Sequence, residues 1–123
     1  MIWTATMWII EYYQASNGKC PTQEFLDDLK KRKELPHAIR LINLLAEHGN
    51  NLKRPYVEHL GGGIYELRIR VKRQQIRILY FYFYQERIIF SHGIRKEDDV
   101  PPSEIDKAQK NKSDYFLKHE RKP

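Results

Sequence analysis

The feature that most constrains the fold of this chain is a nearly continuous run of extended-chain patterns between Ile64 and His92. Three segments in it read IYELRIRV, QIRILYFYFY and RIIFSH, and only short polar steps separate them. β-Branched and aromatic residues dominate, and apolar and polar residues alternate in the first segment. This pattern predicts neighbouring antiparallel strands joined by tight turns at residues 73–74 and 85–86.

Two amphipathic helices are expected upstream of these strands. Pro21 suits the first turn of one helix, and the cations at 30–33 suit its C-terminal end. A second helix is expected from Pro36, with an apolar period of about 3.6 residues, and Gly49 ends it. Because only a few residues join the two helices, we predict an antiparallel helical hairpin.

The two ends of the chain complete the expected fold. MWIIEYY at residues 7–13 predicts a strand, and Ser103 after Pro101-Pro102 predicts the start of a last helix. The basic tail from about residue 117 is expected to fray. The predicted class is α+β: one domain over residues 1–123, with a helical hairpin on one face of a small antiparallel sheet, in the order β-α-α-β-β-β-α.

Composition excludes several classes of protein. A single Cys excludes a disulfide framework within the chain. No apolar run approaches the ~20 residues of a membrane span, so we expect no membrane partner and a cytoplasmic location. No metal or cofactor is expected, because the histidines outside the strand pattern lack ligand spacing with nearby acids: His37, His48, His59 and His119.

Positive charge gathers in the second half of the chain. The net charge is +6; residues 1–63 carry eight Lys and Arg against seven Asp and Glu, and residues 64–123 carry fourteen against nine. The segment from Arg68 to Arg77 holds five cations and no acid. A field of this kind attracts polyanions. The ordinary interpretation, a solvated hairpin tip, is preferred for Lys72 and Arg73.

Strand alternation assigns the side chains to faces. A turn at 73–74 pairs Arg70 with Arg77 and Arg68 with Leu79, and a turn at 85–86 pairs Leu79 with His92. One face then holds Arg68, Arg70, Arg77 and His92. The opposite, helix-covered face holds Tyr65, Leu67, Ile69, Ile78, Tyr80 and Ile89.

The cationic face has two interpretations. Arginine presents donors that match phosphate oxygens, and histidine can transfer a proton near neutral pH. Together they suffice for metal-free RNA cleavage, in which the RNA supplies its own 2′-OH nucleophile. Alternatively, the arginines pair with carboxylates such as Glu66, Glu11 or Asp98. The pattern alone favours neither.

Residues 59–116 resemble the HigB/RelE family of bacterial and phage toxins, most closely its phage-associated HigB-like branch. The similar pieces are Tyr65-Glu66-Leu67-Arg68, Arg77-Ile78-Leu79-Tyr80 and His92-Gly93 before a basic pair, and then a Pro and a helix rich in Ala and Lys. The order and spacing of these pieces carry the resemblance, and the expected RelE-like fold agrees with it.

The resemblance implies a toxin of a type II toxin–antitoxin pair that cleaves mRNA on the ribosome and is neutralised by a cognate antitoxin, often of helix-turn-helix type. The implied catalytic residues are Arg68, Arg77 and His92. The implied RNA-binding residues are Arg70, Lys72, Arg73, Arg95 and Lys96. His59 is a second candidate for acid–base work.

One departure from the family keeps alternatives open. Arg95-Lys96 is followed by Glu97-Asp98-Asp99, where the family has polar residues, and these acids would repel phosphate. A degenerate toxin that only binds its antitoxin, or a gyrase-directed relative of the same fold, are therefore alternatives. The sequence predicts no oligomeric state.

Overall fold

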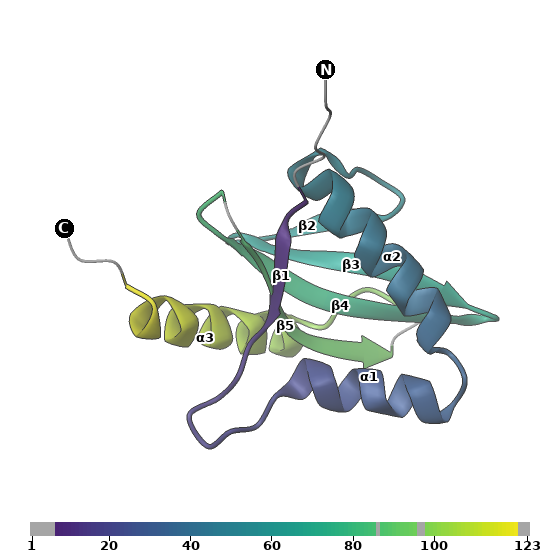
Figure 1. The fold of residues 1–123 in the computed structure, drawn as a ribbon, viewed down its shortest axis with the longest axis horizontal. Helices are drawn as coiled ribbons and strands as arrows, with labels where there is room; N and C mark the ends of the chain where they lie inside the picture. Colours follow the sequence, from purple (N-terminus) through teal and green to yellow (C-terminus); the bar gives the residue numbers. More distant parts are fainter. Residues whose placement is uncertain (1–6, 86, 96–97, 121–123) are drawn as a thin grey trace.

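The structure, a computed structural model, describes residues 7–85, 87–95 and 98–120. It is an α+β fold, as expected: a five-stranded sheet in the order β1-β5-β4-β3-β2 with helices on both faces (Figure 1). The elements are β1 Ile9–Tyr12, α1 Pro21–Lys31, α2 Leu35–His48, the short 3-10 helix η1 Gly49–Asn51, β2 Val57–Gly61, β3 Ile64–Val71, β4 Gln74–Phe83, β5 Arg87–Arg95 and α3 Pro102–Lys118.

The helices α1 and α2 cover one face of the sheet. Pro21 and Pro36 lie in the first turns of α1 and α2, where a missing N–H costs no helical hydrogen bond. The chain reverses between the helices; α1 packs mainly on β5 and α2 on β3 (Figure 1). Their buried faces supply Leu26, Leu29, Ala38, Leu41, Ile42 and Leu45 to the larger core.

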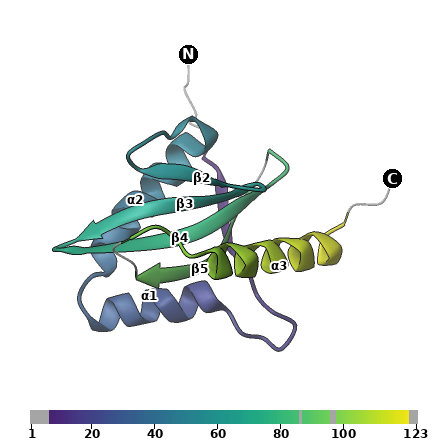
Figure 2. The ribbon, with the colours of Figure 1, turned by 180° about the vertical axis from the view of Figure 1, so that it is seen from behind.

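Helix α3 lies on the opposite face of the sheet (Figure 2). There Ala108 and Tyr115 pack against Leu79, Phe81 and Phe83 in a second core. The sequence predicted this helix but not the face that it covers. None of the helices in the described part of the chain combines the length and hydrophobicity needed to cross a bilayer.

Two features of the sheet differ from expectation. The edge strand β2 was not predicted, because only Val57 among its residues is buried and its sequence, VEHLG, has no clear apolar alternation. The sheet is also mixed rather than wholly antiparallel, since β1 pairs in parallel with β5, with Ile9 opposite Arg87. Strand β1 thus forms the other edge.

In the two central hairpins, almost every side chain lies on the face of the sheet that the sequence predicted. The first turn lies at Lys72 and Arg73, so Arg68 is opposite Arg77; the expected pairing of Arg70 with Arg77 is wrong by two residues. A shift of two residues preserves the face of every side chain.

The second hairpin contains a compensating irregularity. Three residues, rather than two, separate Phe83 from Arg87, and Ser91 is an extra residue between the pairs Leu79–His92 and Tyr80–Phe90. The bulge restores the expected pairing of Leu79 with His92. Between the turn and the bulge the expectation is wrong: Ile89 lies opposite Phe81, on the α3 face.

Candidate functional site

The structure brings the predicted cationic residues together on the α3 face. Arg68 and Arg77 are directly opposite each other on β3 and β4, and the Leu79–His92 pair places His92 on the same face. Strand alternation turns Leu67 and Ile69 to the other side, into the core beneath α1 and α2. The expected sharing of one face by Arg68, Arg70, Arg77 and His92 is confirmed.

Glu66 lies between the two opposed arginines. Arg68 Nε donates a 2.7 Å hydrogen bond to Glu66 Oε1, and Arg77 Nε lies 3.6 Å from Glu66 Oε2. Glu66 is 1% exposed and Arg77 5% exposed. One buried carboxylate therefore neutralises part of the repulsion between two guanidiniums.

Other donors of the two arginines are engaged as well, although the buried Arg77 Nε makes no hydrogen bond of ordinary geometry among the described residues. Arg77 Nη1 donates to the main-chain oxygen of Asp98 at 2.5 Å, and Arg77 Nη2 to Gln75 Oε1 at 2.8 Å. Arg68 Nη2 pairs with Glu58, and the hydrogen bond to Glu66 is the main cause that raises the pKa of Arg68. Arg68 still exposes a third of its side chain, so it remains reachable from solvent.

His92 is buried, with 2% of its surface exposed. Its Nδ1 lies 2.8 Å from Ser91 Oγ and its Nε2 lies 2.8 Å from Glu104 Oε2 in the first turn of α3. Asn111 donates to Ser91 Oγ, so the Ser91 hydroxyl is free to donate to Nδ1 and the network assigns the ring proton to Nε2.

The charge state of His92 follows from its surroundings. Burial lowers the pKa of His92 below its ordinary value of 6.5, and Lys107 acts in the same direction. The hydrogen bond with Glu104 opposes that effect without cancelling it. A neutral imidazole at neutral pH can accept a proton, as a general base must.

Where the structure describes them, the other residues predicted to bind RNA share no hydrogen-bond or ion-pair partner with Arg68, Arg77 or His92. Arg95 lies on the face covered by α1 and α2, where its guanidinium pairs with Glu34 and Asp28. Lys96 and Glu97 lie outside the described residues. Lys72 and Arg73 are exposed at the tip of the first hairpin, and Arg70 is exposed beside them.

The second acid–base candidate, His59, lies apart from the arginines. It pairs with Tyr65 across β2 and β3, which places it on the opposite side of the sheet. Its Nε2 accepts a 3.2 Å hydrogen bond from the Gly63 N–H, and its ring stacks on that of Tyr65. Among the described residues, no group of three or more His, Cys, Asp or Glu side chains could hold a metal ion.

Sequence reasoning named Glu66 as a possible partner but missed Glu58, Ser91 and Glu104. Glu104 reaches His92 only because α3 folds back over the sheet, and no local pattern indicates that return. Ser91 acts through a β-bulge, which strict alternation does not reveal.

Comparison with known families decides the wider relationship. The family described as "Phage derived protein Gp49-like (DUF891)" has a model that matches residues 24–113, from α1 through most of α3. The chain belongs to this family. The Gp49-like family is part of the RelE/HigB-like toxin superfamily, and membership is consistent with a toxin of a toxin–antitoxin pair that has an antitoxin partner. No curated protein matches the chain.

Proposed function

We propose that this Gp49-like protein is the toxin of a type II toxin–antitoxin pair and that it cleaves mRNA on the ribosome. The observation that carries the proposal is the placement of Arg68 directly opposite Arg77, with His92 on the same face of the sheet. Membership of the Gp49-like family supports it. The proposed partner is a cognate antitoxin of helix-turn-helix type.

In the proposed reaction the RNA 2′-OH attacks the adjacent phosphorus. His92 accepts the proton of that hydroxyl, and a protonated group, or water, supplies a proton to the departing 5′-oxygen. Arg68 and Arg77 stabilise the added negative charge of the pentacoordinate transition state. The products are a 2′,3′-cyclic phosphate and a 5′-hydroxyl end.

The contacts of the free protein define what RNA has to displace. The main-chain oxygen of Asp98 lies against Arg77, and Glu104 lies against His92. The segment that leads into α3 therefore has to shift before RNA reaches either side chain. The exposed cations Arg70, Lys72 and Arg73 offer the first phosphate contacts, and an antitoxin would shield the same surface.

The same burial favours a second candidate function. Both ring nitrogens of His92 are engaged, and Arg77 is closed off by Glu66, Gln75 and Asp98. A degenerate toxin, which binds its antitoxin without cutting RNA, would have this arrangement if α3 never moves. Cleavage itself separates the two functions.

The test is cleavage of ribosome-bound mRNA by purified protein. We expect Arg68→Ala to reduce the rate by about 10²–10³-fold, the usual effect of losing a preorganised charge donor. Lys19→Ala is the control, because Lys19 is exposed in the segment before α1 and lies neither on the arginine face nor at the tip of the first hairpin. Arg68 is a sharper target than Arg77, since Arg77→Ala would strand the buried Glu66.

His92→Gln tests the proton transfer. The amide keeps polarity and approximate size but cannot accept a proton near neutral pH, so cleavage should fall while the melting temperature stays within a few degrees of the wild type. Unchanged cleavage by His92→Gln would remove His92 from the mechanism. A wild-type protein that never cuts ribosome-bound mRNA would leave the binding-only function.

A further inference from the structure

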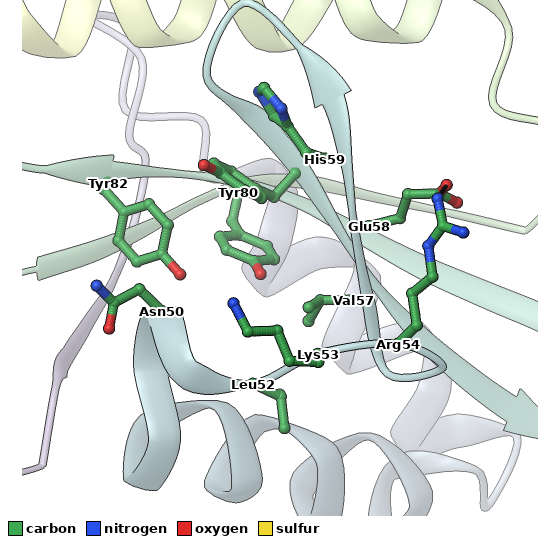
Figure 3. Close-up of a pocket in the computed structure, with 10 residues that line it drawn as sticks. Asn50, Leu52, Lys53, Arg54, Val57, Glu58, His59, Tyr80 and Tyr82 are labelled. Carbon is green, nitrogen blue, oxygen red and sulfur yellow. Dashed lines mark hydrogen bonds and ion pairs between the residues drawn. The ribbon is translucent and has the colours of Figure 1, made fainter.

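A cavity of about 350 Å³ lies on the face of the sheet that α1 and α2 cover, beside η1 and the edge strand β2 (Figure 3). It is separate from the arginine face, since Tyr65, Tyr80 and Tyr82 line it and project away from Arg68 and Arg77. Lys53, Asn50 and Leu52 form its opposite wall. The proposed cleavage of RNA makes no use of this cavity.

The hydroxyl of Tyr80 is the unusual group in the cavity wall. Tyr80 is fully buried, and its Oη makes no hydrogen bond of ordinary geometry among the described residues, although the nearby Tyr82 hydroxyl helps to raise its pKa. Its ring cannot turn freely, because it stacks on Tyr65 at 5.5 Å and meets the edge of Tyr82 at 5.9 Å. Buried hydroxyls are normally satisfied, so this donor calls for a ligand.

Further donors surround the same space. Figure 3 shows the Tyr80 and Tyr82 hydroxyls directed toward the wall from which the Lys53 ammonium reaches back. Burial raises the pKa of Tyr82 to about 12 and raises that of Tyr80 as well, so both phenols keep their protons at neutral pH. The side chain of Asn50 adds an amide at the rim.

Negative charge at the cavity is already neutralised. Glu58 is its acidic lining residue, and the Glu58 carboxylate turns away to pair with Arg54 and Arg68 (Figure 3). Within the described part of the chain, no carboxylate lies at ion-pair distance from Lys53. The cavity therefore presents neutral donors and one unpaired cation.

We propose that this cavity binds a phosphate group, with the hydroxyls of Tyr80 and Tyr82 and the ammonium of Lys53 as its donors. A phosphate group offers three terminal oxygens, enough to accept all three donors, and its charge matches Lys53. Hydrogen bonds to a charged acceptor also satisfy the buried phenol better than a neutral ligand would. The ligand is free phosphate or a mononucleotide, which share this chemistry.

The experiment is a calorimetric titration of the full chain with inorganic phosphate, with adenosine 5′-monophosphate and with adenosine. We expect both phosphates to bind saturably at millimolar concentration and adenosine not to bind. Tighter binding of the nucleotide would identify a mononucleotide as the ligand, and equal binding would identify phosphate alone.

Variants assign the binding to this cavity. Tyr80→Phe and Lys53→Gln should each weaken phosphate binding by roughly tenfold, since each removes one donor to a charged acceptor. Lys31→Gln is the control for charge, because Lys31 lies at the end of α1 and does not line this cavity. Arg70→Gln should also leave binding unchanged, which distinguishes this site from the arginine face, because Arg70 lies on that face but does not line the cavity.

Two results would overturn the proposal. One is an absence of saturable phosphate binding by a wild-type chain with a normal melting transition. The other is binding that Tyr80→Phe leaves intact or that Arg70→Gln abolishes. Neither result bears on RNA cleavage, which is measured separately on ribosome-bound mRNA.

Discussion

At the scale of single residues, Glu66 explains how cations accumulate on one face of a small sheet. Guanidiniums on opposed strand positions repel each other unless an anion lies between them. Glu66 Oε1 accepts from Arg68, and Glu66 Oε2 faces Arg77 Nε at 3.6 Å. Because Arg77 is buried, it depends on this carboxylate far more than an exposed arginine would.

Removing the charge of Glu66 should therefore destabilise the fold. We expect Glu66→Gln to lower the free energy of unfolding by about 3 kcal/mol or more, because it leaves Arg77 buried without a charged partner. Urea denaturation measures the change. Glu58→Gln is the control, since Glu58 is partly exposed and should cost about 1 kcal/mol or less. A similar small loss for both variants would contradict this role of Glu66.

His92 should make stability depend on pH. Its pKa in the folded state lies below 6.5, so the unfolded chain binds the proton more tightly. Its contribution is thus full above pH 6.5 and is lost as the pH falls toward the folded-state pKa. Melting temperatures at pH 7.5 and pH 5.5 should differ less for His92→Gln than for the wild type. An equal difference in both proteins would show that His92 is not the titrating group.

Residue faces could be predicted from the sequence, but residue environments could not. Alternation along β3 and β4 is a local property, and it places Arg68 and Arg77 correctly on one face. His92 on β5 joins them only because the longer second turn and the bulge at Ser91 cancel. Burial of Arg77 and His92 depends on Asp98 and Glu104, which arrive through the return of the chain into α3. The sequence analysis predicted an open cationic face that could bind phosphate. In the structure the same residues are ion-paired and partly covered.

At the scale of elements, the second hairpin shows how two departures can cancel. A turn of odd length alone would have turned His92 to the other face. The extra residue Ser91 reverses that change, so only residues between turn and bulge, such as Ile89, are misplaced by simple alternation. The same bulge positions the Ser91 hydroxyl beside the His92 ring.

Of the two edge strands, the sequence predicted β1 but neither its parallel pairing nor the strand β2. Central strands are buried on both faces, so their apolar content is high and visible in the sequence. Strand β2 is an edge with a single buried residue, and β1 has only four residues. The parallel pairing of β1 with β5 joins segments more than seventy residues apart, and no local pattern carries that information.

The packing of α1 on β5 depends on Gly93. A Cβ at this position would lie 2.2 Å from the ring of Phe25, so any side chain has to displace α1 or the ring. We expect Gly93→Ala to cost about 1–3 kcal/mol of stability, the usual effect of overpacking. Phe25→Ala provides room, so the cost of Gly93→Ala should shrink in that background. An undiminished cost in the double variant would contradict this packing contact.

At the scale of the whole molecule, both faces of the sheet are covered and the tip of the first hairpin remains open. Arg70, Lys72 and Arg73 are exposed there, on a chain of net charge +6. Long-range attraction of RNA would act first at this tip, before α3 shifts to uncover Arg77 and His92. The fold thus separates the exposed cations of the hairpin tip from the buried residues of the candidate site.

Ribosome or RNA binding should accordingly weaken as salt rises. Each phosphate contact contributes to the salt dependence, so Arg73→Gln should reduce the slope of log affinity against log salt concentration by about one. Lys31→Gln removes the same charge from α1 and should leave the slope unchanged. Binding that is indifferent to salt would argue against contacts dominated by phosphate.

The proposed function is tested most directly by mapping mRNA ends after inducible expression of the protein. Attack by the 2′-OH predicts new 5′-hydroxyl ends within translated messages, their loss when translation initiation is blocked, and a strong reduction with Arg68→Ala but not with Lys19→Ala. Growth arrest without new ends, or ends that carry a 5′-phosphate, would contradict ribosome-dependent cleavage by this face of the sheet.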